Sequence, residues 1–150
     1  MRPPPTTAEY LVSWALRAPA HPALREEGTE VTYSQLCGMV IQAVHLLRRH
    51  GVKHGDRVAV AGPGFGVQLI VLLAAEGLGA STLSFQAEGD PDIDFVLSHA
   101  DWVIARAPQT VAAPARFIAL DDGFLRELRQ PVTELDGLWS PQESHEIQRI

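Results

Sequence analysis

Cysteine is almost absent from this sequence, because Cys37 is the single cysteine among 150 residues. A lone cysteine cannot form a disulfide within the chain, and it cannot supply a cysteine-rich zinc site. Small secreted domains rely on several disulfides, so the sequence is not typical of that class. We therefore expect a reducing, cytoplasmic environment for the protein.

Basic residues are also scarce. Twelve Lys and Arg side chains oppose 18 Asp and Glu, which gives a formal net charge of −6 with neutral histidines. Proteins that hold nucleic acids carry a basic surface that displaces counterions from the phosphate backbone. The acidic balance therefore argues against nucleic acid as a partner. Lys53 is the only lysine, so any chemistry that needs a lysine has one candidate.

No long uninterrupted hydrophobic run is present. The most apolar stretch covers residues 67–83, and Gln68, Glu76 and Gly79 are among the residues that interrupt it. A helix that crosses a bilayer needs about 20 consecutive, mostly apolar residues. The first residues, MRPPPTT, also lack the apolar segment of a signal peptide. We expect a buried helix followed by a strand, and no membrane span.

Apolar residues make up 46% of the chain, enough for one hydrophobic core at this length. One segment places apolar residues on a single helical face, namely Leu36, Met39, Val40, Ala43, Val44 and Leu47. Thr32 and Gln35 precede it with the spacing of a capping box. Gly51 suits the left-handed position after the helix, where Val52 can pack back as in a Schellman motif.

The rest of the chain alternates helices and strands. Helices are predicted over residues 8–18, 67–78, 90–99 and 122–129, and strands over residues 57–61, 80–85, 102–105 and 116–120. A hairpin is predicted over residues 23–32, with its turn at Gly28, and Asp90 and Pro91 are expected to open the helix that they begin. This order indicates an α/β fold, with a mostly parallel sheet and helices on both faces. We expect an N-terminal subdomain over residues 1–129 and a polar connector over residues 130–150.

The first candidate site is the glycine-rich turn that contains Gly62, Gly64 and Gly66, between a predicted strand and a predicted helix. Backbone N–H groups in such a turn can hold a phosphate. The dinucleotide fingerprint needs glycine at relative positions one, three and six, but Val67 occupies the sixth position, and no Lys–Ser/Thr pair follows. Pro63 also removes one N–H donor. We interpret the turn as a structural connection and keep cofactor binding through its three glycines as the alternative.

Acidic residues cluster around the start of the next predicted helix, at Glu88, Asp90, Asp92 and Asp94, with Asp101 further on. Their spacing imitates the start of a calcium-binding loop, but Pro91 lies inside it and Phe95 replaces the required glycine. The helix dipole favours acidic residues in a first turn without any metal. The six histidines show no metal-binding spacing. No metal site is therefore expected.

Ser98, His99 and Asp101 are the three residue types of a hydrolase triad. Triads are assembled from separate segments, however, and neighbours in one helical turn are not expected to point at one another. We therefore expect no catalytic residue in the chain. The aromatic and thiol side chains that are predicted to serve as packing are Trp14, Cys37, Phe95 and Trp102.

The helix that begins near Val67 and ends near Leu78 is apolar on nearly every side. Such a helix needs cover all around it, and the other predicted elements cover only one side. We expect this helix to mediate self-association of the chain, or contact with the rest of a larger protein.

Four segments together resemble the beginning of the AMP-binding, adenylate-forming superfamily. In chain order they read HPAL at residues 21–24, VTYSQL at 31–36, GVKHGDRVAV at 51–60 and LLAAEGLGA at 72–80. The superfamily comprises acyl- and aryl-CoA synthetases, adenylation domains of nonribosomal peptide synthetases, and luciferases. The resemblance covers about residues 8–120. One departure is Ser84, which stands where the family usually has proline.

The resemblance implies the N-terminal subdomain of an adenylate-forming ligase, above all of an acyl-CoA synthetase. In such enzymes a carboxylate attacks the α-phosphate of ATP to give an acyl-adenylate and pyrophosphate, and a thiol then takes the acyl group. ATP, Mg²⁺ and CoA are thus implied for a full-length parent, whose remainder would be a partner of this chain.

The family's phosphate-binding loop, its ribose-binding aspartate and its catalytic lysine have no counterpart here, and Lys53 matches neither family lysine. We expect a fragment that ends before the phosphate-binding loop, is inactive alone and binds no cofactor. A stand-alone nucleotide-binding module or a protein-interaction module is the alternative.

Overall fold

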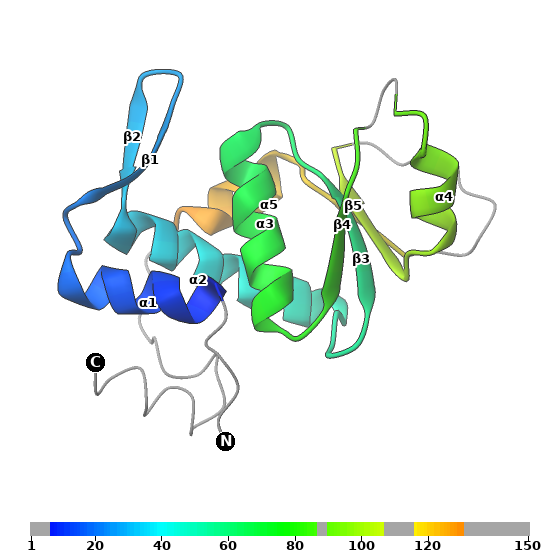
Figure 1. Cartoon of the computed structure of the whole chain (residues 1–150), viewed down its shortest axis with the longest axis horizontal. Helices are drawn as coiled ribbons and strands as arrows, with labels where there is room; N and C mark the ends of the chain where they lie inside the picture. Colours follow the sequence, from blue (N-terminus) through cyan, green and yellow to red (C-terminus); the bar gives the residue numbers. More distant parts are fainter. Residues whose placement is uncertain (1–6, 87–89, 107–115, 131–150) are drawn as a thin grey trace.

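The computed structural model describes residues 7–86, 90–106 and 116–130 (Figure 1). The connector expected over residues 130–150 lies almost wholly outside this part of the chain. The helices and strands in chain order are α1 (Thr7–Arg17), β1 (Pro22–Glu26), β2 (Thr29–Thr32), α2 (Tyr33–His50), β3 (Arg57–Ala61), α3 (Phe65–Gly77), β4 (Ser81–Ser84), α4 (Ile93–Ser98), β5 (Trp102–Ala105), β6 (Arg116–Ala119) and α5 (Asp122–Leu128).

Four of the strands form one parallel sheet in the order β4-β3-β5-β6. Alternate residues along each strand point to opposite faces. One face meets α2, α3 and α5, and the other face meets α4. The predicted α/β class, with a parallel sheet and helices on both faces, is therefore confirmed. The hairpin β1–β2 is a separate antiparallel ribbon that projects from the body (Figure 1).

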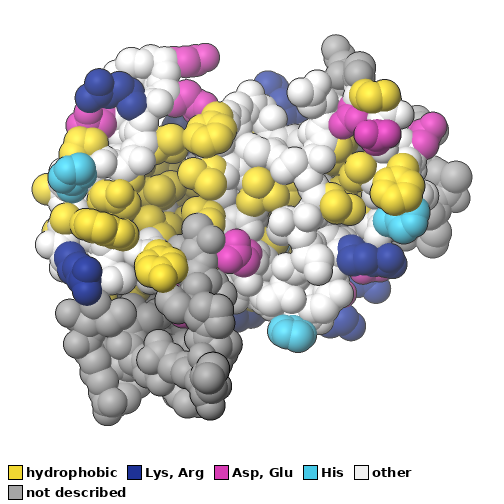
Figure 2. All heavy atoms as spheres, in the orientation of Figure 1, with side chains coloured by type: hydrophobic (Ala, Val, Ile, Leu, Met, Phe, Trp, Pro, Cys, Tyr) yellow, Lys and Arg dark blue, Asp and Glu magenta, His cyan; other side chains and the backbone are white. Residues whose placement is uncertain are grey.

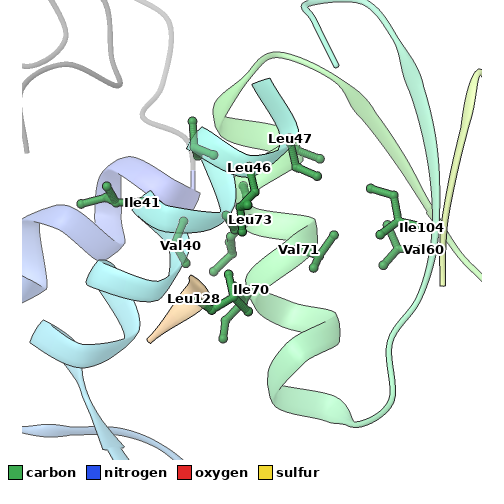
Figure 3. Packing of buried hydrophobic residues seen from close by; sticks show 14 of the residues in the cluster. Val40, Ile41, Leu46, Leu47, Val60, Ile70, Val71, Leu73, Ile104 and Leu128 are labelled. Atoms are coloured by element: carbon green, nitrogen blue, oxygen red, sulfur yellow. The ribbon is translucent and has the colours of Figure 1, made fainter. Parts of the chain in front are cut away.

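The larger core lies between the sheet and the layer of α2, α3 and α5. Val60 and Ile104 project from the sheet toward Val71 of α3, as Figure 3 shows. On the far side of α3, Ile70 and Leu73 lie near α2 and Leu128 of α5. The smaller core on the other sheet face joins α4 to the alternate residues of the strands, and its members are Ala59, Ala61, Phe85, Val96, Leu97, Ala100, Val103 and Ala105.

Helix α2 carries both of the predicted end signals. The Thr32 hydroxyl accepts the Gln35 N–H at 3.1 Å, and the Gln35 side chain accepts the Thr32 N–H at 2.9 Å. Gly51 follows the helix with φ at 108°, a left-handed value that favours glycine. The Val52 N–H donates to the Leu47 carbonyl at 3.0 Å, which completes the Schellman motif.

Helix α4 begins later than the sequence predicts. It starts at Ile93, and Asp90 does not cap it. The Asp90 carboxylate instead accepts the backbone N–H groups of Gln86, at 3.0 Å, and Asp92, at 2.9 Å. These two hydrogen bonds lower the pKa of the Asp90 carboxyl. The prediction failed because the Asp90 side chain is already bound to the backbone N–H groups of Gln86 and Asp92.

Two of the aromatic residues predicted to lie in the core are exposed. Trp14 is 47% exposed and Phe95 is 64% exposed, whereas Trp102 and Cys37 are buried as predicted. Helix α1 packs through Leu11 and Val12, so Trp14 lies at the border of its buried face. It stacks on Tyr33 with a ring-centroid distance of 5.7 Å. Figure 2 shows hydrophobic side chains gathered over α1 and the base of the hairpin.

The apolar helix α3 is covered on both sides. It contacts α1, α2 and β1 on one side and β3 and β4 on the other (Figure 1). Residues 66–78 are all buried or half-buried. The prediction that the other elements cover only one side of this helix is therefore wrong, because α1 and the hairpin fold back over it. No described helix is both long enough and apolar enough to cross a bilayer.

Candidate functional site

The glycine-rich turn joins β3 to α3 at the carboxyl end of the parallel sheet. The chain continues from β3 to β4 on one side, and it then crosses to β5 on the other side. Open α/β sheets bind ligands outside the carboxyl ends of their strands at such a reversal of strand order. The position of Gly62, Gly64 and Gly66 is therefore one where a ligand could be held, provided that their N–H groups are available.

Gly62 is bound by a side chain of the following helix. Its N–H donates to Oε1 of Gln68, whose Nε2 donates to the Val60 carbonyl at 3.0 Å and to the Ser84 hydroxyl at 3.2 Å. A Cβ atom at position 62 would lie 2.8 Å from the Gln68 backbone nitrogen. Glycine is required here for close approach, since the turn lies directly against the first turn of α3.

Gly64 and Gly66 face the hairpin. Gly64 precedes α3 with φ at −166°, an extended conformation, and its carbonyl accepts the Gln68 N–H at 3.0 Å. The Gly66 N–H donates to Oε2 of Glu26 at 3.1 Å. Glu26 is the last residue of β1, so a carboxylate from the hairpin caps the amino end of α3. A carboxylate at this position interacts favourably with the helix dipole.

These contacts decide whether the turn fits a phosphate. A phosphate cradle needs several backbone N–H groups that point outward, together with positive charge. Here the Gly62 and Gly66 N–H groups are bound by Gln68 and Glu26, and Pro63 has no N–H. The negative charge of Glu26 also repels an anion. These three features weigh against the turn as a cradle for the phosphates of ATP or of a dinucleotide.

The acidic cluster does not converge on one point. Asp90 binds backbone N–H groups, and Asp101 binds Arg57 on a different strand. Glu88 lies outside the described residues. Within the described ranges, no group of three His, Cys, Asp or Glu side chains is placed to hold a metal ion.

Ser98 and His99 do come together, contrary to the sequence-based expectation. The Ser98 Oγ lies 3.1 Å from Nδ1 of His99, and both atoms contact the Phe95 carbonyl, at 2.9 and 2.8 Å. Asp101 contacts neither side chain in these hydrogen bonds. Its carboxylate accepts the Arg57 N–H at 2.8 Å and pairs with the Arg57 guanidinium, and these contacts lower the pKa of Asp101. The geometry is that of a helix end, not of a triad.

Asp56 has a role that the sequence did not reveal. Its Oδ2 atom accepts the indole N–H of the buried Trp102 at 3.0 Å and the Lys53 N–H at 3.1 Å. One carboxylate thus closes the turn before β3 and accepts the only polar group of the Trp102 side chain on β5. Lys53 itself is exposed in this turn. A glycine–aspartate pair signals a turn, but its long-range partner carries no local signal.

Comparison with known proteins places this fold in a family. The family model described as AMP-binding enzyme matches residues 11–143, most of the chain. The chain belongs to the AMP-binding enzyme family. The predicted resemblance to adenylate-forming enzymes is thereby confirmed.

Curated relatives include a CoA synthase and a component of an enterobactin synthase. The chain is 36% identical over 134 residues to a feruloyl-CoA synthase of an Amycolatopsis species. The matched region covers 85% of this chain and 26% of the relative. It is 38% identical over 90 residues to enterobactin synthase component F of Escherichia coli O157:H7. This second matched region covers 59% of this chain and 7% of that protein. The chain thus spans about a quarter, or less, of the length of these AMP-binding relatives.

Solved structures share the fold. The N-terminal subdomain of Klebsiella oxytoca NpsA superposes with a TM-score of 0.71 at 18% identity, over 89% of this chain and 33% of that chain. A fatty acyl CoA synthetase of Mycobacterium tuberculosis superposes with a TM-score of 0.67 at 21% identity, over 87% of this chain and 30% of that chain. This member of the AMP-binding enzyme family therefore shares the fold of these N-terminal subdomains.

Proposed function

We propose that the chain supplies the N-terminal scaffold of an ATP-dependent acid–thiol ligase of the acyl-CoA synthetase type. Such a ligase joins a carboxylic acid to ATP, releases pyrophosphate, and passes the acyl group from the adenylate to a thiol. The observation that carries the proposal is the 36% identity to a feruloyl-CoA synthase over 134 residues. The proposed partner is the remainder of such a ligase, which supplies the ATP, Mg²⁺ and CoA sites.

Within this function, the scaffold positions elements and performs no chemical step by itself. Adenylation needs donors and cations that stabilise charge on the transferred phosphoryl group. The turn that could offer such donors is bound internally by Glu26 and Gln68. We propose that no catalytic, cofactor-binding or metal-binding residue lies in the scaffold, that its subdomain extends over residues 1–129, and that residues 130–150 lead to the rest of the ligase. The single buried cysteine is compatible with a cytoplasmic location.

A chimera tests this function. The 134-residue matching segment of the Amycolatopsis feruloyl-CoA synthase is replaced by the corresponding segment of this chain, and formation of a CoA thioester from ferulate, ATP and CoA is measured. We expect a folded, active chimera. The control is the same chimera with Val60→Asp, which places a charge in the main core and should abolish activity together with folding. A chimera that unfolds cooperatively but forms no thioester contradicts the proposed function.

A further inference from the structure

A groove lies between the β1–β2 hairpin and the helical layer, and it shares no residue with the glycine-rich turn. It has a volume of about 610 Å³ and is formed by residues of α1, β2, α2 and the end of α5. Leu16 lines the groove and is 47% exposed, so part of its apolar wall is open to solvent. The other apolar lining residues that the argument uses are Val12, Ala15, Val31, Met39 and Leu128. Exposed apolar surface of this kind ordinarily marks a contact with another segment.

The chain leaves α5 at the rim of this groove. Gln130 lines the groove, and its carbonyl accepts a hydrogen bond from Nε2 of Gln42 on α2 at 3.1 Å. The Gln130 N–H donates to the Glu127 carbonyl at 3.2 Å. Pro131 follows and has no N–H, so the helix cannot continue through it. The residues that come next therefore start from a fixed point beside the apolar wall.

The chain that follows Pro131 has a composition that complements the groove. Up to position 140 its charged residues are Glu134 and Asp136, both acidic. The groove offers the opposite charge, because Arg129 lines it, is exposed and forms no ion pair among the described residues. Glu30, the other charged lining residue, is already paired with Arg25 at 2.6 Å. The apolar residues of this stretch are Val132, Leu135, Leu138 and Trp139.

We propose that residues 132–139 fold back over this groove and place apolar side chains, Leu138 among them, against Leu16 and the neighbouring lining. The segment is tethered at Gln130, which gives it a high effective concentration at the groove that a second copy of the chain lacks. Its docking joins β2 to α1 and α5. A two-stranded ribbon is only marginally stable alone, so this contact stabilises the hairpin. The inference goes beyond the proposed function and does not depend on it.

Cys37 reports on the groove, because it lines the groove and is the only cysteine of the chain. The rate at which a small thiol reagent modifies it is measured at about pH 8 in the full chain. We expect Leu138→Asp to raise this rate at least about 10-fold, because the charge expels the segment from an apolar groove and the thiol is uncovered more often. Ile147→Asp introduces the same charge outside the segment and should change the rate less than about 2-fold.

Leu16→Asp tests the groove side of the contact at a side chain that is already half-exposed. We expect it to accelerate modification of Cys37 to within about 2-fold of the rate in Leu138→Asp, since either change releases the segment. The double variant should react no faster than the single variants, because the contact can be lost only once. Cooperative thermal unfolding shows that each variant is folded. If Leu138→Asp does not fold, Leu138→Ala replaces it, with an expected acceleration of at least about 3-fold.

Each other outcome contradicts the docked segment. Modification in Leu138→Asp at the wild-type rate overturns the proposal, and so does equal acceleration by Ile147→Asp. Effects of Leu16→Asp and Leu138→Asp that multiply also overturn it, because the groove and the segment then act independently. A wild-type rate that rises when the protein is diluted shows that a second copy covers the groove, and it overturns the proposal as well.

Discussion

The carboxylate of Glu26 accepts a hydrogen bond from the N–H of Gly66, 40 residues further along the chain, at 3.1 Å. This contact joins the projecting hairpin to the amino end of α3. The hairpin shares no strand pairing with the main sheet, and two-stranded ribbons are only marginally stable alone. The cap therefore stabilises two elements at once, and it fills a position at the helix N-terminus that an anion would need.

Removal of this cap should destabilise the fold. We expect Glu26→Ala to lower the free energy of unfolding by about 1–2 kcal/mol, because a half-buried N–H loses its charged acceptor. Urea denaturation followed by circular dichroism measures the change. The matched control is Glu30→Ala, which breaks only the exposed ion pair with Arg25 and should cost less than about 0.5 kcal/mol. Equal losses in the two variants would show that the Glu26 cap has no special importance.

The glycines of the turn should differ sharply in their tolerance of alanine. At Gly62 the new Cβ would lie 2.8 Å from the Gln68 backbone, so we expect a loss of about 1–3 kcal/mol. At Gly64 the nearest atom is the Glu26 carboxylate at 3.6 Å, an ordinary contact, so the change should be below about 0.5 kcal/mol. Thermal unfolding of the two variants checks the order, and a larger loss at Gly64 would contradict the described turn.

Burial raises the pKa of the Cys37 thiol from 9.0 to about 11. The unfolded chain therefore releases this proton at lower pH than the folded chain does. The contribution of the protonated Cys37 thiol to the free energy of unfolding is complete below about pH 9, and it is lost as the pH rises toward about pH 11. In this pH window we expect the free energy of unfolding of the wild type to fall by up to about 1.4 kcal/mol more per pH unit than that of Cys37→Ala. Parallel curves of the free energy of unfolding against pH for the two proteins would show that unfolding does not change the titration of the thiol.

Asp56 should matter for stability through its contact with Trp102. In Asp56→Ala the buried indole N–H loses its acceptor at 3.0 Å, which should cost about 1–3 kcal/mol. Asp94→Ala, on the exposed side of α4, is the control and should change stability by less than about 0.5 kcal/mol. Urea denaturation compares the two variants. A similar loss in both would mean that the indole finds another partner.

Local signals were enough to predict most of the elements. Thr32, Gln35 and Gly51 mark the ends of α2 because capping depends on residues that are close in sequence. The same reasoning failed at Asp90. Its side chain could cap α4 or bind nearby backbone N–H groups, and it binds those of Gln86 and Asp92 instead of capping the helix. It also failed for Trp14, because the buried face of α1 depends on where α2 and α3 pack against it.

The contacts that define the candidate site could not be predicted from the sequence. Glu26 and Gln68 are unremarkable in their own segments, since nothing local links a strand-end glutamate to a turn 40 residues away. The sequence did show that the glycine pattern departs from the dinucleotide fingerprint. Only the fold shows that the N–H groups of Gly62 and Gly66 are bound by the protein itself.

We propose that this chain is a scaffold whose glycine-rich turn holds no phosphate. Titration of the chain with Mg·ATP, followed by calorimetry and by the amide resonances of Gly62 and Gly66, tests it most directly. We predict no binding heat and no movement of these two resonances up to about 1 mM nucleotide. Any binding free energy is then weaker than roughly 4 kcal/mol. Saturable micromolar binding that shifts the Gly62 and Gly66 resonances would contradict the claim.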